Sequence, residues 1–233
     1  PSVAAALQGL RFRSYTLQRA IGITGESIER LAAARLYVLL DGRADETTFA
    51  ALAESLVEAG VDMLQLRDKT LDDRQLLSRA CRLRMITRGS KTQFIMNDRP
   101  DLAALSQADG VHVGQDELTV HDARQIVGPK SLIGVSTHSI EQARQAVVDG
   151  ANYVGVGPTF PSGTKSFASF TGIELLRAVA SEISLPAFAI GGITIENLPN
   201  VLETGIRRVA VTGAVVNAAE PNKAAAQLLK TLG

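Results

Sequence analysis

Short apolar runs alternate along this chain with longer stretches in which apolar residues recur at three- and four-residue spacing. The runs have the length of buried strands, and the spacing between them is typical of amphipathic helices. The helical spacing is seen in Phe49-Leu52-Leu56, Leu76-Ala80-Leu83, Ala143-Ala146-Val147 and Leu175-Leu176-Val179. The predicted strands are residues 36–40, 63–67, 94–97, 110–113, 132–136, 153–157, 187–190 and 209–212.

This alternation predicts an α/β fold with a parallel sheet. Eight βα units within roughly 200 residues favour a closed (β/α)8 barrel, or TIM barrel, over residues 36–233. The alternative is an open doubly wound sheet, which usually carries a glycine-rich dinucleotide motif after its first strand. The residues there, Asp41-Gly42-Arg43-Ala44, do not form that motif.

Residues 1–35 differ from the repeating part, because their apolar residues indicate short helical pieces broken near Gly22 to Gly25. We expect a helical extension that packs on the barrel and carries no chemistry of its own. The chain starts at Pro1 without a Met, which indicates a piece or a processed form of a longer protein.

Net charge, apolar run length and cysteine count limit the kinds of partner and location that we expect for this protein. The formal net charge of the 233 residues is zero, which argues against a dedicated binder of nucleic acid or anionic membranes. No apolar run reaches the roughly 20 residues needed to cross a bilayer. Cys81 is the only cysteine, so no intrachain disulfide can form and a cytoplasmic location is expected. Its place in a helical stretch predicts a buried, inert thiol. A homo-oligomer is compatible with the sequence.

The end of the second predicted strand carries candidate chemistry. Side chains alternate faces along a strand, so Gln65 and Arg67 share one face, and Lys69 follows just beyond it. TIM barrels hold their active sites at the carboxyl ends of the strands. A guanidinium beside an ammonium suits a phosphate or diphosphate, whereas solvated surface charges are the simpler alternative.

Acidic and amide side chains follow the third and fourth strands, at Asn97-Asp98 and Asp116-Glu117. Mg²⁺ prefers oxygen ligands and often binds through one or two carboxylates together with substrate phosphates. Asp98 could equally cap the helix predicted near Pro100. The sequence does not decide whether Asp116 or Glu117 would be the second ligand.

The remaining strand ends offer hydroxyls, a further ammonium and glycines. Ser136 could donate to phosphate or begin the next helix, His112 is expected to be an interior residue, and His138 a rim residue. The loop after strand six carries Lys165, but Thr164 interrupts the Gly-Lys pair that a P-loop needs. The last two strands end in Gly191-Gly192 and Thr212-Gly213, where TIM barrels often bind phosphate through backbone N–H groups.

These segments together resemble the thiamine-phosphate synthase family. The resemblance runs in order from about residue 36 to the end and rests on Gln65-Leu66-Arg67-Asp68-Lys69, Asn97-Asp98, Ala108–Gln115, Gly134–His138, Tyr153–Pro158, Thr164-Lys165 and Ala189–Ile193. It implies a transferase that joins 4-amino-2-methyl-5-pyrimidinylmethyl diphosphate to a (carboxy)thiazole phosphate and releases diphosphate.

The resemblance also implies roles for single residues. It assigns the pyrimidine diphosphate to Gln65, Arg67, Lys69 and Asn97, with Ser136 and Lys165 on the diphosphate; Arg67, Lys69, Lys165 and Ser136 are the expected catalytic groups. It assigns Mg²⁺ to Asp98 and Glu117, although the family usually has Asp where Glu117 stands. It places Ser162 and Thr164 near the thiazole, and Gly192, Thr212 and Gly213 at the thiazole phosphate.

Two other functions fit the same barrel. A thiazole tautomerase would use a histidine such as His138 for proton transfer and would need no diphosphate site. A non-catalytic sensor of thiamine intermediates would not need the metal site. The joint presence of Gln65, Arg67, Lys69 and Asn97-Asp98 favours the synthase.

Overall fold

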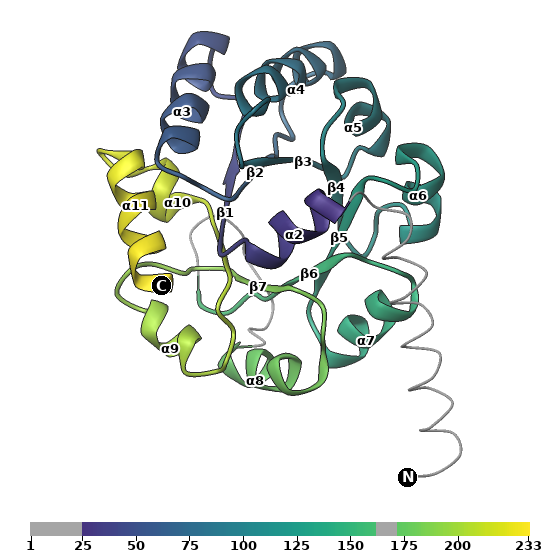
Figure 1. The fold of residues 1–233 in the computed structure, drawn as a ribbon, viewed down its shortest axis with the longest axis vertical. Helices are drawn as coiled ribbons and strands as arrows, with labels where there is room; N and C mark the ends of the chain where they lie inside the picture. Colours follow the sequence, from purple (N-terminus) through teal and green to yellow (C-terminus); the bar gives the residue numbers. More distant parts are fainter. Residues whose placement is uncertain (1–24, 162–171) are drawn as a thin grey trace.

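The computed structural model describes residues 25–161 and 172–233 and shows a closed barrel of parallel strands surrounded by helices (Figure 1). The strands follow one another around the barrel in chain order, and the last pairs with the first. The predicted TIM barrel is therefore confirmed, and predicted and observed strand ends differ by at most one residue. The strands are β1 (Leu36–Leu40), β2 (Met63–Leu66), β3 (Gln93–Asn97), β4 (Gly110–Val113), β5 (Leu132–Thr137), β6 (Tyr153–Val156), β7 (Ala187–Ile190) and β8 (Val209–Val211).

The helices begin where short polar side chains can cap them. Asp72 accepts a hydrogen bond from the Gln75 N–H, and the Gln75 side chain accepts in return, so the helix starts with a capping box. Asp45, Thr119 and Ser139 cap three others, each with its side chain accepting a hydrogen bond from the N–H three residues later. The helices are α2 (Gly25–Ala33), α3 (Glu46–Glu58), α4 (Asp73–Thr87), α5 (Pro100–Ser106), α6 (Val120–Val127), α7 (Ile140–Val148), α8 (Gly172–Glu182), α9 (Leu198–Leu202), α10 (Gly213–Val216) and α11 (Pro221–Leu232).

The apolar core has two layers because each strand is buried on both faces. One layer lies between the strands and the surrounding helices and includes Phe49, Leu64 and Leu176. The other fills the interior of the barrel, where Met63, Ile95 and several aromatic rings meet. Because side chains fill the interior, the barrel is a packed core and a ligand can bind only at its ends.

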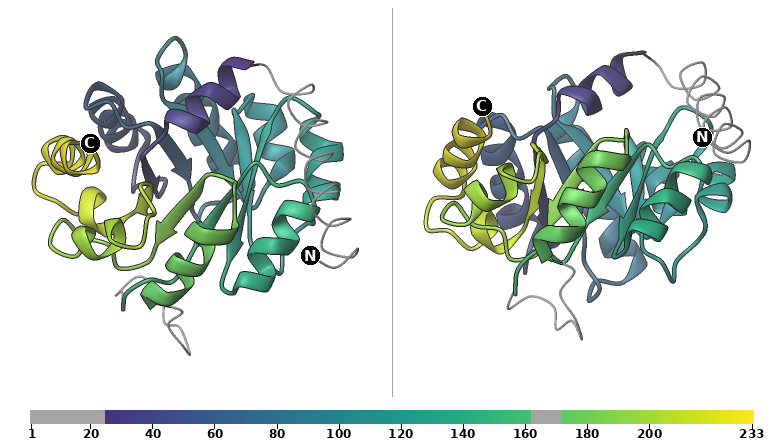
Figure 2. Two further views of the ribbon diagram at one scale, coloured as in Figure 1. Left: turned by 60° about the horizontal axis from the view of Figure 1, so that its bottom comes forward. Right: turned by 90° about the horizontal axis from the view of Figure 1, so that it is seen from below.

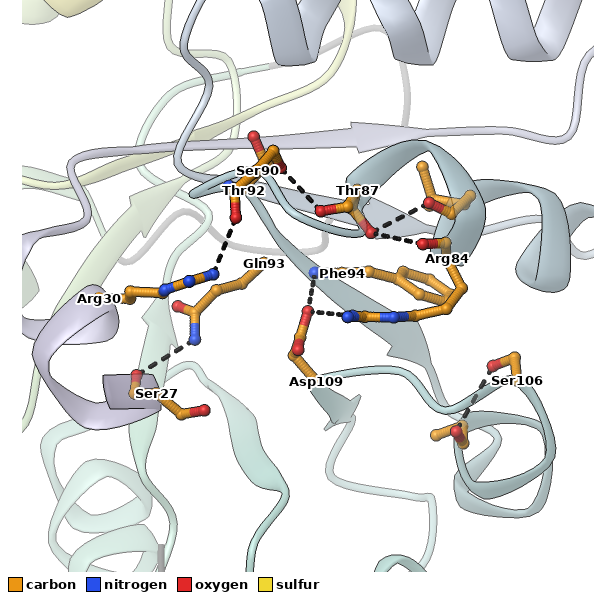
Figure 3. A network of polar contacts seen from close by, with 12 residues as sticks. Ser27, Arg30, Arg84, Thr87, Ser90, Thr92, Gln93, Phe94, Ser106 and Asp109 are labelled. Atoms are coloured by element: carbon orange, nitrogen blue, oxygen red, sulfur yellow. Dashed lines mark hydrogen bonds and ion pairs between the residues drawn. The ribbon is translucent and has the colours of Figure 1, made fainter. Parts of the chain in front are cut away.

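Helix α2 lies across the amino-terminal end of the barrel, as Figures 1 and 2 show. Leu31 and Ala34 pack into the interior layer. Arg30 donates to the Ser90 carbonyl at 2.9 Å, and Gln93 donates to the Ser27 carbonyl at 3.1 Å (Figure 3). The expected packing of the extension thus holds for α2, whereas residues 1–24 lie outside the described part and the domain boundary at residue 35 stays a prediction.

Near α2, Asp109 accepts hydrogen bonds from Arg84 and from the Phe94 N–H, both at 2.8 Å (Figure 3). This pair joins the end of α4 to β3 and β4 at the same end of the barrel. Polar networks at this end of a TIM barrel serve stability. The opposite end is therefore where a site is expected.

The structure also bears on two expectations that do not concern the site. Cys81 is exposed, so the prediction of a buried thiol was wrong. The reason is its position on α4, one residue past Ala80, which lies on the buried face with Leu76 and Leu83. Within the described ranges, no helix is long and apolar enough to span a membrane.

A candidate active site at the barrel mouth

The tip of β2 carries a cation, the guanidinium of Arg67. Gln65 is buried and points into the barrel, where it contacts Tyr37, so alternation places Arg67 on the same inward face. The Arg67 backbone N–H donates to the Leu40 carbonyl at 2.8 Å, which holds the strand end against β1. Across residues 25–161 and 172–233, the half-buried Arg67 guanidinium makes no hydrogen bond or ion pair. Among these residues it therefore has no counter-ion that would compete with a bound anion.

Asp68, between the two cations, organises the loop that carries them. Its carboxylate accepts from the backbone N–H groups of Gly42, Thr70 and Leu71 and from the Thr70 hydroxyl, at 2.7 to 3.0 Å. Burial opposes ionisation, but these hydrogen bonds outweigh it and lower the pKa of Asp68 to about 2. Asp68 had no predicted role, although an Asp beside a turn with Thr two residues later is a signal for such a loop.

The tip of β3 joins the same cluster. Asn97 donates to the Asp98 carboxylate at 2.7 Å, and the Lys69 ammonium lies 3.8 Å from the same oxygen. Asp98 has a φ of 58°, in the left-handed region, and its N–H donates to the His112 carbonyl at 2.8 Å. The N-cap position of α5 is occupied by Arg99, whose side chain makes no capping hydrogen bond. Asp98 is therefore not the helix cap, and its carboxylate faces the cluster instead.

The proposed second metal ligand lies in the loop after β4. Glu117 and Asp116 are exposed, and Glu117 packs beside Gly114. In the part of the chain that the structure describes, no three acidic, histidine or cysteine side chains gather into a metal site. A site made from Asp98 and one loop carboxylate would suit Mg²⁺ only together with substrate phosphates, which is the way this ion often binds.

Ser136, at the end of β5, is linked to the barrel interior. Its hydroxyl lies 3.0 Å from His112 Nε2, and its carbonyl accepts from Gln115. The adjoining helix is capped by Ser139, so Ser136 does not begin it. His112 is buried, as expected of an interior histidine, whereas His138 is exposed at the rim and hydrogen bonds through Nδ1 with the Gly157 carbonyl.

On the far side of the mouth, β7 ends against the segment that follows β6. Gly192 has a φ of 62°, and an added Cβ would lie 2.5 Å from the Pro161 carbonyl oxygen, so no other residue fits easily there. Thr212 precedes the short α10, whose first residue is Gly213. Ser162, Thr164 and Lys165 lie outside the described residues.

Comparison with known proteins agrees with this geometry. The family model described as thiamine monophosphate synthase matches residues 36–215. The chain belongs to this family. A thiamine-phosphate synthase from Rhodopirellula baltica is 46% identical over 91% of this chain, and one from Chloroflexus aurantiacus is 42% identical over 87%. A solved thiamine phosphate pyrophosphorylase from Pyrococcus furiosus superposes with a TM-score of 0.77 at 34% identity, over 85% of this chain and 95% of that one.

The relatives differ in how much of their length this chain spans. It covers 59% of the Rhodopirellula protein and 67% of a Gloeobacter violaceus thiamine-phosphate synthase, but 94% of the Chloroflexus protein. The chain thus spans 59% of the length of one of these relatives and nearly all of another.

The buried histidine in the barrel of this thiamine monophosphate synthase family member should make the free energy of unfolding depend on pH. Burial lowers the pKa of His112 from 6.5 to about 4. As the pH falls below 6.5, the unfolded chain binds a proton at this imidazole and the folded chain does not. The folded state therefore loses stability as the pH falls from about 6.5 to about 4. The expected loss from this one group is about 3 kcal/mol.

Urea unfolding of the wild-type protein and His112→Gln, at about pH 7 and about pH 4.5, measures this effect. The wild-type free energy of unfolding should fall more than that of the variant, because glutamine does not titrate. Equal falls in the two proteins would show that His112 is protonated when folded.

Proposed function

We propose that this chain catalyses the thiamine-phosphate synthase reaction, joining 4-amino-2-methyl-5-pyrimidinylmethyl diphosphate to a thiazole phosphate and releasing diphosphate. Membership of the thiamine monophosphate synthase family supports this reaction. The observation that carries it is Arg67, which has no counter-ion among the described residues, at the tip of β2 beside the cluster of Lys69, Asn97 and Asp98. The Arg67 guanidinium, with an ammonium and an amide beside it, offers several donors and two positive charges. Such a site suits a diphosphate ligand better than a ligand with a single carboxylate.

The pyrimidine diphosphate would lie over the tips of β2, β3 and β5. Gln65 would contact the pyrimidine from the barrel interior, and Arg67, Lys69 and Asn97 would surround the diphosphate. The Ser136 hydroxyl would donate a hydrogen bond to the diphosphate from the opposite side. Lys165 is assigned there as well, on its position in the family motif.

Asp98 and Glu117 would hold Mg²⁺ at the same place. The oxygen of Asp98 that does not accept from Asn97 is without a hydrogen bond among the described residues, and Glu117 is exposed in a neighbouring loop. These hard oxygen donors fit the ion. When bound, Mg²⁺ would neutralise charge on the diphosphate.

The thiazole phosphate would occupy the other side of the mouth. Backbone N–H groups near Gly192, Thr212 and Gly213 would bind its phosphate, in the region where this fold commonly does so. Ser162 and Thr164 are assigned to the thiazole on their motif positions. This arrangement brings the thiazole nitrogen and the pyrimidine methylene together between the two anion subsites.

The chemistry follows from the charges. Loss of diphosphate breaks the bond between the methylene carbon and oxygen and leaves a pyrimidinylmethyl cation, and the thiazole nitrogen supplies the electron pair for the new C–N bond. Negative charge grows on the departing diphosphate, so Arg67, Lys69 and Ser136 would stabilise the transition state more than the ground state. An aromatic nitrogen needs no general base, so the rim position of His138 is consistent with this function.

Turnover of the two substrates by the 233-residue chain tests the proposal. Thiamine phosphate should form in the presence of Mg²⁺, stop on addition of EDTA, and return with excess Mg²⁺. Formation of no product, with binding of thiazole phosphate alone, would contradict the proposal and favour the tautomerase or the sensor.

A further inference from the structure

A continuous chain of polar side chains crosses the interior of the barrel between two proposed substrate contacts. The Gln65 amide donates to the Tyr37 hydroxyl at 2.5 Å, and the hydroxyls of Tyr37 and Tyr153 lie 3.1 Å apart. The Tyr153 hydroxyl lies 3.3 Å from His112 Nδ1, and His112 Nε2 lies 3.0 Å from the Ser136 hydroxyl. We call these five residues the interior chain.

The neighbouring strands are built to make room for the interior chain. A Cβ added to Gly134 would lie 2.1 Å from the Tyr153 ring and 2.5 Å from His112 Nδ1. One added to Gly155 would lie 3.3 Å from the His112 ring. Neither glycine has a positive φ, so the backbone conformation does not require them. Their absent side chains provide the space in which the phenol and the imidazole meet.

Buried polar groups cost free energy unless they are hydrogen bonded, and apolar side chains could fill a barrel more simply. Phe188 does so here, packing edge-on against both Tyr37 and Tyr153 without any polar group. The interior chain therefore needs a reason beyond packing. Its two ends supply one, because both are proposed contacts of the same substrate.

Counting donors gives the interior chain a direction. Tyr37 accepts from Gln65, so its own proton can go only to Tyr153, the other polar group in contact with it among the described residues. The Tyr153 proton then goes to Nδ1 of His112. A neutral imidazole has one N–H, which is left on Nε2 and donates to the Ser136 oxygen. The Ser136 proton is thereby left free to point out of the barrel.

The two ends then match the two ends of one ligand. The Gln65 carbonyl oxygen is buried and has no hydrogen-bond partner among the described residues, so it can accept from an amino group. Ser136 can donate to an anion. An aminopyrimidine diphosphate offers a donor at one end and an acceptor at the other.

We propose that His112, oriented by Tyr37 and Tyr153, is a positioning residue that directs the Ser136 proton to the diphosphate and couples this donor to recognition of the pyrimidine amino group by Gln65. The proposal rests on the proposed function. Breaking the interior chain at any link would leave Ser136 free to rotate and to donate elsewhere. The same loss follows whether the missing link is near Ser136 or on the far side of the barrel.

A double-mutant cycle tests the coupling. Tyr153→Phe keeps the ring and removes only the hydroxyl, and we expect it to lower kcat about tenfold, the scale of one hydrogen bond. In a Ser136→Ala background the same change should have no further effect, because its target is gone. Phe188→Leu is the packing control, since Phe188 contacts both tyrosines but makes no hydrogen bond, and its effect on kcat should stay within about twofold.

The His112 variants add a second criterion. Glutamine places its amide near the position of Nε2 and can still donate to Ser136, whereas asparagine is one methylene shorter and cannot reach it. We expect His112→Gln to retain more turnover than His112→Asn. Equal turnover in the two variants, or additive effects of Tyr153→Phe and Ser136→Ala, would overturn the positioning role.

Nitrogen-15 NMR of histidine-labelled protein tests the direction without requiring activity. The chain has three histidines, so His112→Gln assigns the His112 signals by difference. The expected result is a neutral ring protonated at Nε2, and protonation at Nδ1 would overturn the direction. If the wild-type protein formed no thiamine phosphate, the proposed function and the catalytic role of the interior chain would both fail, while the tautomer would still report its hydrogen-bond direction.

Discussion

Replacing Arg67 by alanine should lower kcat/KM by more than about 100-fold, the scale of removing a charged contact to a transition state. The guanidinium is half-buried at the tip of β2 and has no partner among the described residues, so the substrate anion would be its first counter-ion. Charge on the diphosphate rises as the C–O bond breaks, so the loss should appear in kcat as well as in KM. Steady-state kinetics with the pyrimidine diphosphate as the varied substrate measures both.

Arg74→Ala is the matched control for this change. Arg74 is exposed on α4 and makes no ion pair within residues 25–161 and 172–233, so its removal should leave kcat/KM within about twofold. An effect of only a few-fold for Arg67→Ala would show that the diphosphate does not bind at this strand tip. A decrease of equal size in both variants would indicate a general electrostatic effect.

Changing Asp98 to asparagine should lower kcat by about 100-fold at low Mg²⁺ and raise the Mg²⁺ concentration needed for half-maximal activity. Asparagine keeps the size of the side chain and can still accept from Asn97, which donates to Asp98 at 2.7 Å. What it loses is the charge that would hold the ion and that faces Lys69 at 3.8 Å. Titration of turnover with Mg²⁺ separates weaker metal binding from loss of the site.

The neighbouring loop carboxylates provide the comparison. Glu117→Gln and Asp116→Asn each remove one charge from an exposed side chain after β4, and only the true second ligand should shift the Mg²⁺ requirement. We expect the shift from Glu117→Gln. If Asp98→Asn required no more Mg²⁺ than the wild-type protein, Asp98 would not be a ligand.

Much of the fold could be read from local pattern. Each predicted strand corresponds to an observed one because a buried parallel strand needs a short run of mostly apolar residues, and each strand here has one. The alternation of side chains along 63–67 likewise placed Gln65 and Arg67 on one face. The wrong prediction for Cys81 has the opposite cause, because one residue of helical phase decides whether a side chain is buried.

The roles of individual residues in the site were harder to predict from local sequence. Asp98 was equally compatible with a helix cap, and only its backbone conformation with a φ of 58° and its contacts with Asn97 and Lys69 remove that alternative. The anchoring of the cationic loop by Asp68 depends on the Gly42 N–H, which belongs to the loop after the preceding strand.

The order of the elements, the end of the barrel at which polar side chains gather and the residue types available there follow from local sequence, because they depend on periodicity and on the position of each residue relative to its own strand. The tertiary structure alone decided which of these side chains meet. Tyr37 and Tyr153 are separated by 116 residues and lie on strands that are not neighbours, yet their hydroxyls are 3.1 Å apart. Closure of the barrel creates that contact, and no local signal in the sequence encodes it.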